Sequence, residues 1–118
     1  MNVRLDFRAD HLLVVVDGPY DRGLAREELG RILDTCDERA ITRLLIDGRG
    51  VPGGVGIHER LDAAELLASH RTIRVAILVA PENMFSKMIE ASAVSRGAQV
   101  RTTDSLEEAV AYLGISTP

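Results

Sequence analysis

Residues 44 to 57 have the sequence Leu44-Leu45-Ile46-Asp47-Gly48-Arg49-Gly50-Val51-Pro52-Gly53-Gly54-Val55-Gly56-Ile57. The apolar start predicts a buried strand that ends in an acid. The glycines predict a loop over residues 48–56 that leads into an amphipathic helix. Many α/β domains place a phosphate-binding or regulatory site at such a junction. This loop has no Lys, Ser, Thr or Cys, so the sequence favours a binding or regulatory module over an enzyme.

The length and composition fit a single domain over residues 1–118. Hydrophobic residues make up 46% of the chain, which is enough for one core. Aromatic residues make up 3%, so platforms for stacking bases are scarce, and the net charge of −4 gives no overall attraction to a phosphate backbone. We therefore expect no nucleic-acid partner.

Cysteine content and hydropathy indicate the compartment. Cys36 is the single cysteine, so the chain cannot form an intramolecular disulfide, and a lone thiol does not make a structural zinc site. No apolar run approaches the roughly 18 residues of a membrane span, and the first residues lack the apolar core of a signal peptide. These features predict a soluble cytoplasmic protein with no membrane span, no metal and no cofactor.

The spacing of apolar residues predicts five strands and four helices in the order β-β-α-β-α-β-α-β-α. The strands are expected at residues 3–8, 11–17, 42–47, 73–80 and 99–103, and the helices at residues 21–39, 57–69, 84–95 and 106–113. Two residues separate the first two strands, which suits a hairpin and is too few for a parallel crossover. The fold class is therefore α/β, with a single mixed β-sheet that begins with an antiparallel hairpin and continues with alternating helices and strands.

Burial and helix ends are also predicted. The first strand alternates Val3, Leu5 and Phe7 with charged residues, which is typical of a half-buried edge strand. The continuous apolar run over residues 12–16 favours a strand that is covered on both faces. Ser105 followed by Glu108 forms a capping box at the start of the last helix, and Gly114 provides a left-handed stop.

Several segments carry a resemblance to a known family: Val16-Asp17-Gly18, Leu44-Leu45-Ile46-Asp47, Val75-Ala76-Ile77-Leu78-Val79 and residues 105–113. With the element order, they resemble the STAS domain of anti-anti-sigma factors. The closest resemblance is to the SpoIIAA-like branch, which is related to lipid-binding SEC14-type domains. In phospho-regulated STAS domains, the acid after the third strand precedes a phosphorylated Ser or Thr. Asp47 matches the acid, but Gly48 and Arg49 occupy the hydroxyl positions, so the resemblance implies a regulatory domain without the usual acceptor.

The loop and the start of the next helix are the predicted partner-binding surface. It comprises Asp47, Gly48, Arg49, Gly50, Gly53, Gly54, His58 and Glu59. The glycine amides and Arg49 could also hold an anion at the helix N-terminus. The alternative is structural, because Asp commonly accepts N–H bonds at turns and the glycines then form a plain connector. An enzyme that uses Asp47 and Arg49 is the weakest of these interpretations.

The histidines do not predict a metal site. His58 and His70 lie about 18 Å apart along one predicted helix, at 1.5 Å per residue, and His11 lies in the hairpin. None of the three has a Cys or a second His at helical spacing, as a zinc site on a helix would. We therefore expect each His to be an exposed polar residue.

The third predicted helix offers a second candidate site. Met84, Phe85 and Met88, with Ile89 beside them, are more large side chains than one inward stripe accommodates. Methionine suits adaptable contacts, so these residues could line a groove for a partner or for an apolar ligand. The alternative is ordinary core packing.

Two functions follow from these observations. The first is a non-catalytic regulatory or protein-interaction module that acts through residues 48–60 on an unidentified protein partner. The second is a carrier of a small apolar or lipid-like ligand held between the sheet and the third helix, as the resemblance to SEC14-type domains implies. A homodimer is a further expectation, because an edge strand offers unpaired backbone groups.

Overall fold

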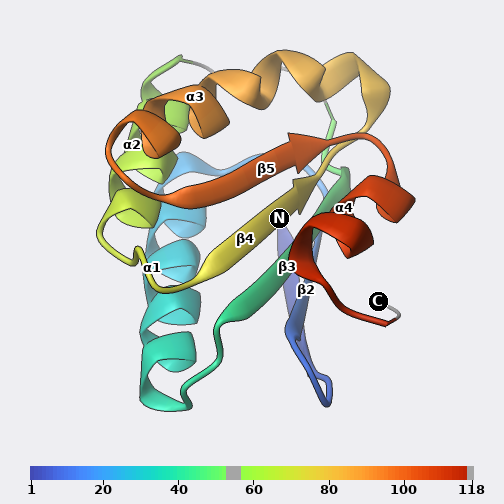
Figure 1. The fold of residues 1–118 in the computed structure, drawn as a ribbon. Helices are drawn as coiled ribbons and strands as arrows, with labels where there is room; N and C mark the ends of the chain where they lie inside the picture. The colour runs from blue at the N-terminus through green and yellow to red at the C-terminus, as the bar shows by residue number, and fades with distance from the viewer. Residues whose placement is uncertain (53–56, 117–118) are drawn as a thin grey trace.

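The computed structural model describes the backbone of residues 1–52 and 57–116, and the side chains of these residues except 57–61 and 84–88. The elements follow the expected order (Figure 1). They are β1 (Asn2–Phe7), β2 (Leu12–Asp17), α1 (Arg22–Glu38), β3 (Arg43–Gly50), α2 (Ile57–Ala68), β4 (Arg74–Leu78), the 3₁₀ helix η1 (Pro81–Ser86), α3 (Lys87–Ser95), β5 (Gln99–Thr103) and α4 (Leu106–Leu113). No helix in the described part of the chain is long and apolar enough to cross a membrane.

The five strands form one mixed sheet in the order β1-β2-β3-β4-β5. The β1–β2 pair is antiparallel, and the pairs β2–β3, β3–β4 and β4–β5 are parallel. The expected fold class and the leading hairpin are therefore confirmed, and β1 and β5 are the two edges. The carboxyl ends of β2, β3, β4 and β5 meet at one end of the sheet, where ligand sites of open α/β sheets usually lie.

Helices cover the sheet on both faces, so that the core has two parts. Alternate residues of each strand point to opposite faces, and even-numbered residues of β2 and β3 such as Val14 and Leu44 pack against α1, α2 and α3. Leu45 and Leu78 point to the other face, where Ala109 and Leu113 of α4 cover them. Figure 1 shows the three-helix layer on one side of the sheet and α4 on the other.

Strand β3 is longer than predicted. The loop was expected to begin at Gly48, but the strand continues through Gly50, which pairs with Asp17 of β2. Gly50 O also accepts a hydrogen bond from Gly18 N at 3.1 Å. The glycines could not signal this pairing, because Gly is depleted in strands and the stabilising contact comes from β2, which is distant in the sequence.

Helix α3 begins later than predicted, because residues 81–86 form the 3₁₀ helix η1. Pro81 fixes its own φ and lacks an N–H group, and Asn83 N donates to Ala80 O at 2.9 Å, closing the turn. Such 3₁₀ turns are frequent at the start of α-helices. The end of the helix is as expected, since Gly97 adopts a positive φ of 94° there.

The predicted cap of α4 is confirmed. Ser105 Oγ accepts a hydrogen bond from Glu108 N at 3.1 Å, and Gly114 ends the helix with a left-handed φ of 69°. The second half of the capping box is indirect: Ser105 N donates to Thr103 Oγ1, and that hydroxyl donates to Glu108 Oε2. A buried Thr at the end of β5 therefore links strand and helix.

Candidate functional site

The helix layer leaves the carboxyl ends of the central strands incompletely covered. Val14, Leu44 and Val75 face this layer and are at most 1% exposed. Their neighbours two residues further along each strand, Val16, Ile46 and Ile77, are only partly buried. Because these three positions lie in interior strands, their exposure marks a hollow between the sheet and the helices.

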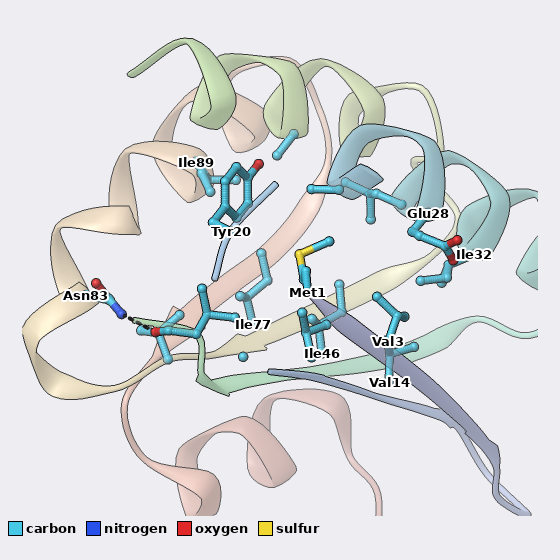
Figure 2. A pocket seen from close by; sticks show the side chains of 17 residues that line it. Met1, Val3, Val14, Tyr20, Glu28, Ile32, Ile46, Ile77, Asn83 and Ile89 are labelled. Carbon is cyan, nitrogen blue, oxygen red and sulfur yellow. Dashed lines mark hydrogen bonds between the residues drawn. The ribbon is translucent and has the colours of Figure 1, made fainter. Parts of the chain in front are cut away.

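This hollow is an apolar cavity of about 180 Å³. Its lining comprises Met1, Val3, Val14, Val16, Tyr20, Ala25, Glu28, Leu29, Ile32, Ile46, Gly48, Val51, Ala63, Ile77, Val79, Asn83 and Ile89. Figure 2 shows side chains of the sheet, including Val14, Ile46 and Ile77, pointing towards Ile32 of α1 and Ile89 of α3. Small residues contribute to the space, since Gly48, Ala25 and Ala63 lie where larger side chains would fill it.

Three lining residues carry polar groups. Asn83 Nδ2 donates to Val51 O at 3.1 Å, which joins the start of η1 to the end of β3 at one side of the cavity (Figure 2). Glu28 Oε1 accepts a hydrogen bond from Arg31, outside the cavity, at 3.2 Å. Tyr20 is the third. Since most of the described lining is aliphatic, the cavity offers mainly dispersion contacts.

The size of the cavity limits what it can hold. Apolar cavities of about 150 Å³ in other proteins remain dry and bind benzene or xenon. A cavity of about 180 Å³ therefore accommodates a guest of the size of a small ring or a short alkyl chain. Among the described residues of the lining, Glu28 and Tyr20 carry the groups that could act as a nucleophile or metal ligand.

Asp47 and Arg49 form a second feature, on the opposite face of the sheet. Asp47 pairs with Leu78, whose side chain packs under α4, whereas Ile46 faces the cavity. Arg49 Nη2 and Nε lie 2.8 Å and 3.0 Å from the two carboxylate oxygens of Asp47, and Arg49 N donates to Asp47 Oδ1. These hydrogen bonds hold the pKa of Asp47 below its ordinary value, and Asp47 raises the pKa of Arg49.

The ion pair between Asp47 and Arg49 affects what the Asp47 carboxylate can do chemically. The Asp47 carboxylate accepts the amide of residue 49, as the structural interpretation expects, and it also binds the Arg49 side chain. A carboxylate that is already neutralised in this way is a poor general base. The arginine remains half exposed, so one cationic group at the end of β3 is accessible to a partner.

The two glycines of this segment differ in how closely they are packed. A Cβ atom on Gly50 would lie 2.7 Å from Asp17 Cβ, whereas a Cβ atom on Gly48 would lie 3.6 Å from Leu78 O. Gly50 is therefore required by close strand packing, and Gly48 is not. The glycines expected to form a binding loop serve in part to bring β2 and β3 together.

Several expected site residues lie outside the part of the chain that the structure describes. Gly53 and Gly54 are outside the described backbone, and the side chains of His58 and Glu59 in α2 are outside the described side chains. The same holds for the side chains of Met84, Phe85 and Met88. Ile89, the next large residue of that segment, lines the cavity. The partner surface and the third-helix groove therefore remain predictions.

The expectation that all histidines are exposed is wrong for His11. This side chain is 3% exposed, and its Nδ1 lies 2.7 Å from Asp10 Oδ1. Asp10 Oδ2 also accepts a hydrogen bond from Ser116 N, so the hairpin turn and the end of the chain meet at this point. This contact could not be predicted from the sequence, because residues 10 and 116 are far apart in the chain and only the fold brings them together.

His70 is partly buried and joins the end of α2 to α1. Its Nδ1 lies 2.7 Å from Asp37 Oδ2, and its Nε2 lies 3.9 Å from Asp34 Oδ1. Both acids are exposed on α1. These three residues form a surface contact between two helices. None of them lines the cavity.

Cys36 does not provide a reactive thiol. It is fully buried on the inner side of α1, and burial raises the pKa of its thiol to about 11. Because the thiolate is the nucleophilic form, this group is inert near neutral pH in the folded protein.

Comparisons with known proteins extend these observations to the whole fold. No protein-family model and no curated protein matches the chain. Among solved structures, the unphosphorylated anti-sigma factor antagonist SpoIIAA is similar, with a TM-score of 0.61, 12% sequence identity, and coverage of 98% of this chain and 100% of that chain. An uncharacterised protein of the DUF3478 family with a SpoIIAA-like fold, from Shewanella loihica PV-4, has a TM-score of 0.59 and 18% identity, covering 95% of this chain and 92% of its own.

These identities are low, so the similarity concerns the fold and not the activity. Both similar structures extend over nearly the full length of the chain, including the leading hairpin and the closing helix. The predicted resemblance is confirmed at that level: the chain adopts the STAS/SpoIIAA-like α/β fold.

Proposed function

We propose that the chain is a non-catalytic binding protein that holds one small apolar molecule between its sheet and helices α1, α2 and α3. The observation that supports this function is the cavity of about 180 Å³ at the carboxyl ends of β2, β3 and β4. Its floor consists of Val16, Ile46 and Ile77, which a fully packed core would bury. Filling the cavity with an apolar guest restores the missing dispersion contacts.

The guest is expected to be uncharged where it enters the cavity. A buried charge without a partner is strongly unfavourable. Among the described lining residues the one carboxylate is that of Glu28, which already binds Arg31. Asn83 and Tyr20 provide neutral polar groups at the side of the cavity. A small ring, a short-chain alcohol or the end of an alkyl chain fits these conditions.

Native mass spectrometry of freshly purified protein, combined with thermal unfolding in the presence of benzene or a short-chain alcohol, tests this function. We expect either a retained mass that is lost on denaturation, or stabilisation by an added guest. A guest at tenfold excess over its Kd stabilises the folded state by about 1.4 kcal/mol. A spectrum of the empty protein together with an unchanged melting temperature across the probes would contradict the proposal.

A second candidate function is regulatory contact with a protein partner through the end of β3. The half-exposed Arg49 on the face opposite the cavity supports it, as does the SpoIIAA-like fold. Gly48 and Arg49 occupy the positions expected for hydroxyl groups, so this contact would not depend on phosphorylation at that site. Arg49 is held by Asp47 in one orientation, which lowers the entropy lost when a partner binds.

The variant Arg49→Glu tests this contact once a partner has been isolated by cross-linking in the source cells. We expect the affinity for that partner to fall about tenfold or more, because the charge at the contact is reversed and the pair with Asp47 becomes repulsive. Arg96→Glu is the matched control, since Arg96 is also exposed but lies at the end of α3. Equal affinity of the wild type and Arg49→Glu would exclude this surface.

A further inference from the structure

Strand β1 presents an open edge of the sheet. It pairs with β2 on one side and is the first strand in the sheet order, so no strand of residues 1–52 or 57–116 lies on its other side. Five of its six residues are exposed, including Leu5 at 37% and Phe7 at 45%. The Arg39 guanidinium carbon lies 4.3 Å from the centroid of the Phe7 ring. An open edge with apolar side chains favours pairing with another strand.

The hairpin determines which backbone groups of β1 point outwards. Arg8 N donates to His11 O, and the register pairs Asp6 with Leu13 and Arg4 with Val15. In an antiparallel ladder, the pairs that exchange hydrogen bonds alternate along the strand. The even-numbered residues therefore bond to β2, and the N–H and C=O groups of Val3, Leu5 and Phe7 point to the open edge.

We propose that β1 forms a homodimer by pairing antiparallel with β1 of a second copy, with Leu5 opposite Leu5. In this register Leu5 exchanges hydrogen bonds with Leu5 of the second copy, and Val3 exchanges them with Phe7. Every outward N–H group of these residues therefore faces a C=O group. Val3 then lies opposite Phe7 on one face, and the exposed apolar strip is shared between the two chains. This interface lies at the sheet edge and goes beyond the proposed ligand function, on which it does not depend.

Charges on the other face select this register. With Leu5 opposite Leu5, Arg4 of each copy lies opposite Asp6 of the other, which gives two favourable cross-strand pairs. Asp6 already binds Arg8, which directly follows the strand in the same chain, at 2.9 Å, so each Asp6 would lie between two cations. Opposite charges on directly opposed residues stabilise a sheet, and like charges destabilise it.

The neighbouring registers are less favourable. A shift by one residue would place outward groups opposite groups that are bonded to β2, so only shifts by two residues keep the hydrogen bonds. One such shift places Arg4 opposite Arg4. The other places Asp6 opposite Asp6 and Arg4 opposite Arg8. Of these three registers, the one with Leu5 opposite Leu5 is therefore the one in which the charges of β1 are complementary.

Sedimentation velocity of the full chain over a range of concentrations tests the proposal by charge exchange. We expect the wild type to dimerise, and Arg4→Asp and Asp6→Arg each to weaken the dimer about tenfold or more, because each places two like-charge pairs in the interface. The double variant is expected to restore the dimer. A mixture of the two single variants is expected to form a heterodimer, since the four charges are then complementary.

Two proline variants test the backbone pairing separately. Leu5→Pro removes an N–H group that points to the open edge and is expected to abolish the dimer while the chain stays folded, as judged by circular dichroism. Asp6→Pro removes an N–H group that bonds to β2 and is expected to destabilise the monomer itself. A monomeric wild type at all concentrations would overturn the proposal, and so would a dimer that Arg4→Asp and Leu5→Pro leave unchanged.

Discussion

Replacing Ile77 by Phe is expected to weaken binding of an apolar probe such as benzene at least tenfold, which corresponds to about 1.4 kcal/mol. Ile77 lies in an interior strand and is partly exposed only because the cavity lies above it. A larger side chain at this rigid position projects into the space that the guest would occupy. The measurement is the increase in melting temperature caused by the probe, which should disappear in the variant.

The stability of Ile77→Phe separates filling of the cavity from disruption of the core. Enlarging a side chain in a packed core costs about 1–3 kcal/mol, whereas a ring that enters an existing hollow should change the free energy of unfolding by less. Val15→Phe is the matched control, because Val15 is a partly buried strand residue on the face opposite the cavity. Loss of probe binding in Val15→Phe, or normal binding in Ile77→Phe, would show that the guest does not occupy this cavity.

The sequence predicted the parts of the fold that depend on local patterns. The apolar run of β2, the alternating apolar faces of the helices and the Ser105 cap each produced the expected element in the expected order. These signals come from residues that are close together in the chain, and they agree with one another. The resemblance to SpoIIAA-like domains rested on the same elements and was confirmed as a fold.

The sequence failed where a contact between distant segments determines the structure. The extension of β3 through Gly50 depends on Asp17, and burial of His11 depends on the way the hairpin packs near Ser116. None of these lengths or distances is contained in the spacing of residues along the chain.

The cavity was predicted only in outline. An apolar site between the sheet and the third helix was one of two alternatives and stays a prediction, while Ile89 of that helix lines the cavity. The other lining residues could not be predicted one by one, because the sequence pattern of an aliphatic residue that lines a cavity does not differ from that of one that fills a core. The low aromatic content of 3% is the one sequence feature consistent with a cavity, since few large side chains are available to fill the space.

Replacing Gly50 by Ala is expected to lower the free energy of unfolding by about 2–3 kcal/mol, the upper part of the range of about 1–3 kcal/mol for overpacking a closely packed site. The new methyl carbon would lie 2.7 Å from Asp17 Cβ and 3.4 Å from Asp17 Cα, and neither atom is at the flexible end of a side chain. Relief requires β2 and β3 to separate where their register is already irregular, next to Asp17. Urea unfolding followed by circular dichroism measures the change.

Gly48→Ala provides the control for this prediction, because it makes the same chemical change two residues earlier in the same strand. Its methyl carbon would lie at an ordinary contact distance of 3.6 Å from Leu78 O, and neither Gly48 nor Gly50 has a positive φ. The loss of chain entropy in the unfolded state is the same for both variants and favours folding by about 0.4–1 kcal/mol. A difference of about 2 kcal/mol or more between the two variants therefore measures the packing of Gly50 against Asp17. Equal stabilities would show that β2 and β3 can separate at this point at little cost, and that Gly50 belongs to the flexible loop that the sequence first indicated.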